Sequence, residues 1–189
     1  MKTAYRAYPI LFLATATALL AHPGHGDQSG LVAGFAHPLS GWDHALAMIA
    51  VGIWAAQLGA PRLVPAAFLG MMAIGGVLGQ LAGAVPGIDQ GIAASVLILG
   101  LLIARTVRLP VAMAVAIVGL FAVFHGMAHG AEMPATAGGL AYGAGFIAAT
   151  AALHAVGIGL GYATLRRDAR LPQVAGWAIA AAGAAIAVL

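Results

Sequence analysis

Two short stretches of this sequence place metal-binding side chains next to apolar runs. The first, residues 37–44, reads HPLSGWDH, and the apolar run after it continues to Trp54. The second, residues 124–132, reads FHGMAHGAE and ends another apolar run. Each stretch holds two imidazoles and one carboxylate. Such groups are costly beside a segment of hydrocarbon length, so they indicate a function or a binding partner.

The spacing within each stretch predicts which side chains can act together. His125 and His129 are four residues apart, so in a helix they stack on one face with Cβ atoms about 5–6 Å apart, a recurrent way to present two imidazoles to one metal ion. Glu132 follows one turn later. His37 and His44 are seven apart and share a face if that segment is helical. Asp43 points elsewhere, and we expect it either to bind the ion or to hold an imidazole in place.

The available donors limit the kind of metal. The chain has no cysteine, seven histidines and five acidic residues. Imidazole and carboxylate without thiolate suit Ni, Co, Zn, Fe or Cu(II), and they disfavour Cu(I) and an all-oxygen calcium cage. His22 and His25 could gather metal at an entrance. His154 lies deep in a later apolar run, where it is either a second metal station or an interhelical hydrogen-bonding group.

Composition makes the chain a polytopic membrane protein. It is 62% hydrophobic and 7% charged, whereas a soluble domain carries about 25% charged residues. The net charge of +3 comes from scattered basic residues that form no basic face, which argues against nucleic-acid binding. There is no Walker loop and no G-x-S-x-G elbow, so nothing supports an ATP-driven pump or a serine hydrolase.

We expect an all-α fold of six transmembrane helices that follows a cleavable signal peptide. Residues 1–21 have a basic start, a short apolar core and small residues that favour cleavage after Ala21; the alternative is an uncleaved first helix. Residues 22–189 then form one domain. We expect Pro38 to break or kink its first helix. The six helices are predicted at Leu31–Leu58, Leu63–Val85, Ile88–Ala104, Pro110–Gly130, Ala137–Leu165 and Pro172–Leu189.

The arginines predict the orientation of these helices. Every basic residue after the signal peptide lies in the connections that follow the first, third and fifth helices: Arg62, Arg105, Arg108, Arg166, Arg167 and Arg170. The positive-inside rule makes these connections cytoplasmic, so the mature N-terminus is periplasmic and the chain is a multi-pass protein of the bacterial inner membrane. Both histidine stretches then reach the same outer depth. A lone membrane histidine is most often a hydrogen-bonding group, but four histidines and two acids at one depth favour a shared divalent-metal site.

At these residues the chain resembles the HupE/UreJ family of nickel and cobalt permeases linked to hydrogenase and urease maturation. The resemblance lies in His37-x5-Asp43-His44 and in Phe124-His125-Gly126-x-Ala128-His129-Gly130-x-Glu132, and it covers essentially the whole chain. It implies uptake of Ni²⁺, or alternatively Co²⁺, as a transported ion rather than a prosthetic group. The functional positions that it implies are His37, Asp43, His44, His125, His129 and Glu132.

Two other readings compete with a permease. An intramembrane zinc enzyme would use His125 and His129 with Glu132 as general base, but a zincin carries its base directly after the first histidine, where this chain has Gly126. An intramembrane metal sensor or assembly factor would bind the ion without transporting it. Flux of the metal, rather than its binding, separates this last reading from a permease.

Overall fold

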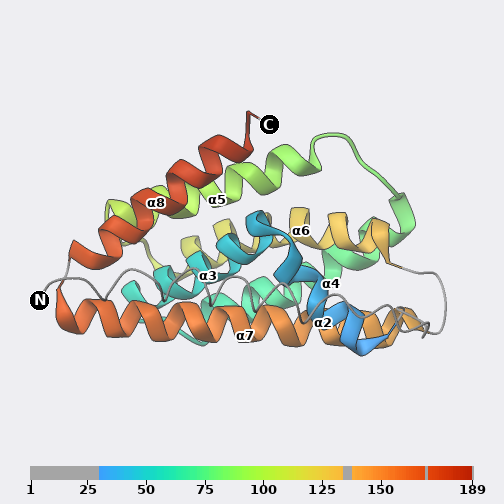
Figure 1. Ribbon diagram of the computed structural model, residues 1–189, viewed down its shortest axis with the longest axis horizontal. Helices are drawn as coiled ribbons and strands as arrows, with labels where there is room; N and C mark the ends of the chain where they lie inside the picture. The colour runs from blue at the N-terminus through green and yellow to red at the C-terminus, as the bar shows by residue number, and fades with distance from the viewer. Residues whose placement is uncertain (1–29, 134–137, 169, 189) are drawn as a thin grey trace, which may run out of the picture.

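The computed structural model describes residues 30–133, 138–168 and 170–188, and it is all-α (Figure 1). The predicted signal peptide, His22 and His25 lie outside the described residues. The helices are α2 (Leu31–Ser40), α3 (Trp42–Gln57), α4 (Leu63–Ala82), α5 (Ile88–Ala104), α6 (Val111–Glu132), α7 (Gly138–Arg167) and α8 (Arg170–Ile186).

The first predicted helix is divided into two helices, and the break lies at Gly41 rather than at Pro38, where a break or kink was expected. Pro38 lies inside α2, and the chain breaks at Gly41, where α2 and α3 meet at 87°. The backbone of Gly41 is extended, and the Ser40 hydroxyl donates to the His37 carbonyl at 2.6 Å. A Cβ on Gly41 would lie 2.9 Å from the Asp43 carboxylate. The absence of a side chain at Gly41 therefore permits the close approach of the Asp43 carboxylate.

Helices α4 and α6 run parallel to each other in close contact. A Cβ on Gly75 would strike Val123, and a Cβ on Gly79 would strike Met127. Residue numbers therefore increase in the same direction along both helices. Close backbone approach at small residues is a common way to pack helices in a membrane. This contact sets the position of α6, and with it the position of both histidines near the end of α6.

Two other pairs of helices also pack closely along their lengths. Helices α3 and α7 are parallel, and α5 and α8 are antiparallel neighbours along one edge of the molecule (Figure 1). Helix α3 contacts α2, α4, α5, α7 and α8, so it forms the centre of the bundle. Its Trp54 is fully buried and donates from Nε1 to the Val107 carbonyl at 3.1 Å.

The directions in which the helices run give the bundle two ends with different residues. We call the end that holds α2, the start of α3 and the last turns of α6 the histidine end. The opposite end, the arginine end, holds the start of α4, the end of α5, the start of α6 and the junction of α7 with α8. All the arginines of the described residues lie at the arginine end: Arg62, Arg105, Arg108, Arg166, Arg167 and Arg170.

The helices confirm a membrane protein but only part of the predicted set of six spans. Helices α4, α6 and α7 are long and apolar enough to cross a bilayer, and α2 with α3 makes a fourth candidate if the bent pair is one span. Helices α5 and α8 have 17 residues each, the lower limit for crossing about 30 Å of hydrocarbon. The other predicted boundaries hold to within a few residues.

Candidate metal centre

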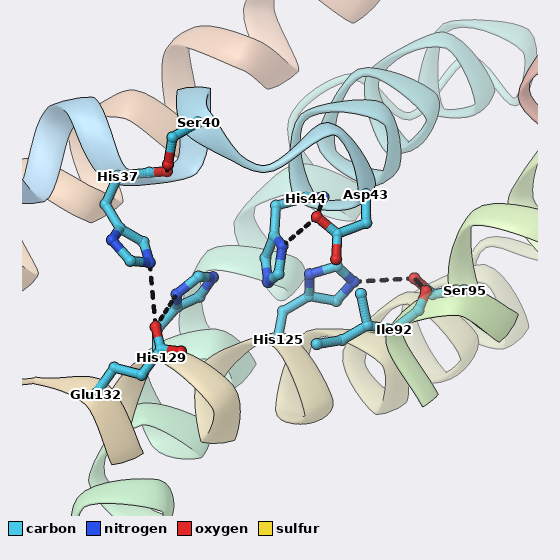
Figure 2. Close-up of polar contacts among 9 residues, drawn as sticks. All are labelled: His37, Ser40, Asp43, His44, Ile92, Ser95, His125, His129 and Glu132. Carbon is cyan, nitrogen blue, oxygen red and sulfur yellow. Dashed lines mark hydrogen bonds and ion pairs between the residues drawn. The ribbon is translucent and has the colours of Figure 1, made fainter. Parts of the chain in front are cut away.

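Three ligand atoms from two helices meet at the outermost part of the histidine end. His37 of α2 and His129 and Glu132 of α6 each offer one atom, and these atoms all lie within 4.8 Å of one another. His37 Nε2 is 3.2 Å from Glu132 Oε2, and His129 Nδ1 is 4.0 Å from the same oxygen. Figure 2 shows the three side chains pointing toward one another. Two imidazoles and a carboxylate at this separation can hold one divalent ion.

The imidazoles continue inward from this group as an unbroken series. Ring centroids are 4.9 Å apart from His37 to His129, 4.3 Å from His129 to His44, and 4.9 Å from His44 to His125. The series also runs from exposed to buried. The side chain of Glu132 is 62% exposed and that of His37 is 34% exposed, whereas His129 is 9% exposed and His125 is fully buried. Exposure therefore falls overall from the two outer ligands to the innermost imidazole, with His44 at 12% close to His129.

Asp43 contacts the ring of its neighbour in the sequence. Its Oδ1 accepts the Nδ1–H of His44 at 2.7 Å and the backbone N–H of His44 at 2.8 Å. A proton on Nδ1 leaves Nε2 of His44 with a free lone pair, and that atom is buried without a hydrogen-bond partner among the described residues. A carboxylate that holds a metal-binding imidazole from behind is a common arrangement in metal sites. This geometry favours the positioning role of Asp43 over direct binding.

His125 is held from behind by a side chain on another helix. The Ser95 hydroxyl of α5 lies 2.9 Å from His125 Nε2, and Phe68 of α4 packs on the ring at a centroid distance of 5.7 Å (Figure 2 for Ser95). The opposite nitrogen, Nδ1, is buried and has no hydrogen-bond partner in the described part of the chain. His125 and His44 thus each use one nitrogen for a protein contact and keep the other free.

Several buried imidazole nitrogens of this site lack a hydrogen-bond partner, which is energetically unfavourable. Six buried imidazole nitrogens lack a hydrogen-bond partner within residues 30–133, 138–168 and 170–188. Two belong to His154, and four belong to this site: His44 Nε2, His125 Nδ1 and both nitrogens of His129. Leaving a buried polar atom unpaired costs about 1–3 kcal/mol. Four such atoms in one small region of an apolar bundle indicate a site arranged for a ligand that supplies the missing interaction.

The electrostatics of the site select a cation. Asp43 and Glu132 supply two carboxylates beside the imidazoles, while the arginines of the described residues lie at the opposite end of the bundle. Opposite charges attract each other at short range, and the attraction strengthens as the site becomes more buried. A divalent cation offsets both carboxylates and provides an acceptor for the imidazole lone pairs at the same time.

The structure therefore brings together all six residues predicted for the main site and leaves His154 apart. His154 is buried on α7, and neither of its ring nitrogens has a hydrogen-bond partner in the described residues. Phe68 packs edge-on against it at 5.0 Å and also packs against His125 at 5.7 Å, whereas no imidazole of the series is in ring contact with His154 among the described residues. Sequence reasoning missed Ser95, for which the only signal is a hydroxyl inside the apolar run of α5, and it missed Phe146, whose ring lies 4.1 Å from that of His129.

Two comparisons with known proteins point to the same family. Residues 10–186 match the sequence profile described as "HupE / UreJ protein". The chain is 48% identical over 172 residues to "Protein HupE" of Rhizobium leguminosarum bv. viciae, and the match covers 89% of each chain. No solved structure matches. The extent of both matches leads to one conclusion: the chain belongs to the HupE/UreJ family, a family of transporters and not of enzymes.

Proposed function

We propose that this chain is a secondary permease or channel-like facilitator that takes up Ni²⁺, with Co²⁺ as the alternative substrate, across the bacterial inner membrane. Residues 22–189 form its single transmembrane domain after removal of residues 1–21, and its mature N-terminus is periplasmic. The histidine end then faces the periplasm. The imported metal supplies the maturation machinery of a hydrogenase or a urease.

One observation carries this proposal: a His–His–Glu group with an exposed carboxylate and a half-buried imidazole continues inward as a series of imidazoles that ends in the buried His125. A closed structural site has no need of such a graded entrance. A transport site must bind the ion well enough to remove its water and weakly enough to release it, so it uses several partial sites in sequence. The family and the set of nitrogen and oxygen donors support nickel or cobalt as the ion.

The proposed path begins at Glu132 and His37, which are the most exposed ligands. The ion loses part of its water there, reaches His129, and passes to the free nitrogens of His44 and His125. Moving a divalent cation inward across 100 mV releases about 4.6 kcal/mol, twice the ~2.3 kcal/mol per elementary charge. The membrane potential alone can therefore drive uptake. The arginines at the arginine end fit the cytoplasmic face.

Uptake of radiolabelled nickel by cells that express the chain tests this function, and we expect the initial rate to fall as the medium is acidified from about pH 7.5 to about pH 5.5. Protons compete with Ni²⁺ for the same imidazole nitrogens, because only the neutral ring binds a metal. The membrane potential should be held constant with an ionophore. A rate that is equal at both pH values, or no uptake above that of cells without the chain, would contradict the proposal.

Two substitutions of Asp43 separate a positioning role from direct binding. We expect Asp43→Ala to weaken nickel binding by about tenfold to a hundredfold, because the ring of His44 loses the acceptor that orients it. Asp43→Asn keeps an oxygen that can accept the Nδ1–H, so it should retain most of the affinity. Calorimetric titration of the purified protein measures both effects. Equal losses in the two variants would show that the ion binds the carboxylate itself.

A further inference from the structure

The buried hydroxyl of Ser95 has a role at this site that the sequence motifs do not include. Ser95 lies on α5, is fully buried, and is 30 residues away in the sequence from the histidine that it contacts. Its Oγ is 2.6 Å from the Ile92 carbonyl oxygen and 2.9 Å from His125 Nε2 (Figure 2). One hydroxyl thus makes two short contacts, and it has only one proton to share between them.

The position of that proton follows from the two partners. The Ile92 carbonyl can only accept a hydrogen bond, and two oxygens 2.6 Å apart with no proton between them would repel each other. The Ser95 hydroxyl therefore donates to Ile92 and must accept from His125. His125 then carries its proton on Nε2, and Nδ1 keeps the lone pair.

We propose that Ser95 is a positioning residue that fixes the tautomer of His125 and so directs the Nδ1 lone pair at the transported metal. The inference rests on the proposed function for the identity of the metal. Asp43 does the same for His44 with the opposite nitrogen, because it accepts from Nδ1 and leaves Nε2 free. The two innermost imidazoles of the series are thus each held by one acceptor, a carboxylate in one case and a hydroxyl in the other.

Ser95→Ala tests this role selectively, because it leaves only one atom without its hydrogen-bond partner. The Ile92 carbonyl lies inside α5, where it accepts its ordinary helical hydrogen bond. The atom that loses its partner is His125 Nε2. The ring can then place its proton on either nitrogen, and we expect nickel affinity to fall by about tenfold to a hundredfold. Ser95→Thr keeps a hydroxyl that can bond the same carbonyl in a helix, so it should restore the wild-type behaviour.

The tautomer itself is measured by nitrogen NMR of the full-length, metal-free protein with ¹⁵N-labelled histidine, in which His125→Gln identifies the ring signals. We expect a protonated Nε2 and an unprotonated Nδ1 in the wild type and in Ser95→Thr, and a mixture in Ser95→Ala. Thr150→Val is the matched control, because it also removes a buried hydroxyl, one that donates to a helical carbonyl at 2.9 Å, but leaves His125 untouched.

Three results would overturn the proposal: a wild-type His125 protonated at Nδ1, a tautomer that Ser95→Ala leaves unchanged, or a nickel affinity that Thr150→Val lowers as much as Ser95→Ala does. The NMR measurement contains no metal and no transport step. Its failure is therefore distinguishable from failure of the proposed nickel uptake, which would appear in the wild-type protein as an absence of flux.

Discussion

Replacing His129 with alanine is expected to reduce nickel uptake by roughly a hundredfold or more, beyond the effect of losing a residue that only supports a ligand. Among the histidines of the described residues, His129 is the one whose ring contacts both the half-buried His37 and the inner His44, with centroids 4.9 Å and 4.3 Å away. Neither of its nitrogens has a hydrogen-bond partner in the described residues. Its removal breaks the path in the middle.

His154→Ala provides the matched comparison for this variant. It also deletes a buried histidine with two unpaired nitrogens, but the ring that packs on that residue is Phe68 rather than an imidazole of the series. Uptake of radiolabelled nickel, corrected for the amount of each variant in the membrane, should fall far more for His129→Ala than for His154→Ala. Wild-type uptake by His129→Ala, or equal losses in both variants, would contradict the role assigned to His129.

The second large effect is expected from Gly126→Ala, which changes no ligand. Gly126 lies between His125 and His129 on the sequence, on the face of α6 that touches α4. An added Cβ would overlap the Met72 carbonyl and lie 2.8 Å from the Gly76 nitrogen, and backbone cannot move aside as a flexible side chain does. We expect a loss of stability of about 3 kcal/mol or more. Because α6 must shift, nickel affinity should fall with it.

Gly70→Ala on α4 is the control for this substitution, because a Cβ there meets nothing within 4 Å. It should leave the melting temperature unchanged or raise it, since alanine favours a helix by up to about 1 kcal/mol over glycine. Thermal unfolding of the purified proteins, followed by nickel titration, measures both variants. If Gly126→Ala melts and binds nickel as Gly70→Ala does, the close contact between α4 and α6 does not position the histidines.

The sequence predicts the meeting of the two histidine stretches, and the reason is physical. Apolar segments of membrane-spanning length alternate in direction. The arginines lie in every second connection between them and so identify one end of the bundle. Two stretches some eighty residues apart must then reach the same end of the bundle. The pairing of His125 with His129, four residues apart in a helix, needs only helical geometry, and α6 does continue through Glu132.

Other features depend on contacts that sequence periodicity cannot express. His37 and His44 do not share a helix face, because the chain turns by 87° at Gly41; they reach the same series from two separate helices. Pro38 is a stronger sequence signal for a break than Gly41, yet the bend falls where the Asp43 carboxylate packs against the backbone. The contact of Ser95 with His125 joins two helices, and nothing within either helix predicts it.

Nickel flux into liposomes that contain only this protein tests the central claim most directly. The vesicles should hold a metal-sensitive dye and an inside-negative potential, with cobalt and zinc as competitors. We expect nickel entry that depends on the potential for the wild type, and none above the background of empty vesicles for His129→Ala. Nickel that binds the wild-type protein with no entry into the vesicles would rule out a permease and indicate a sensor or assembly factor.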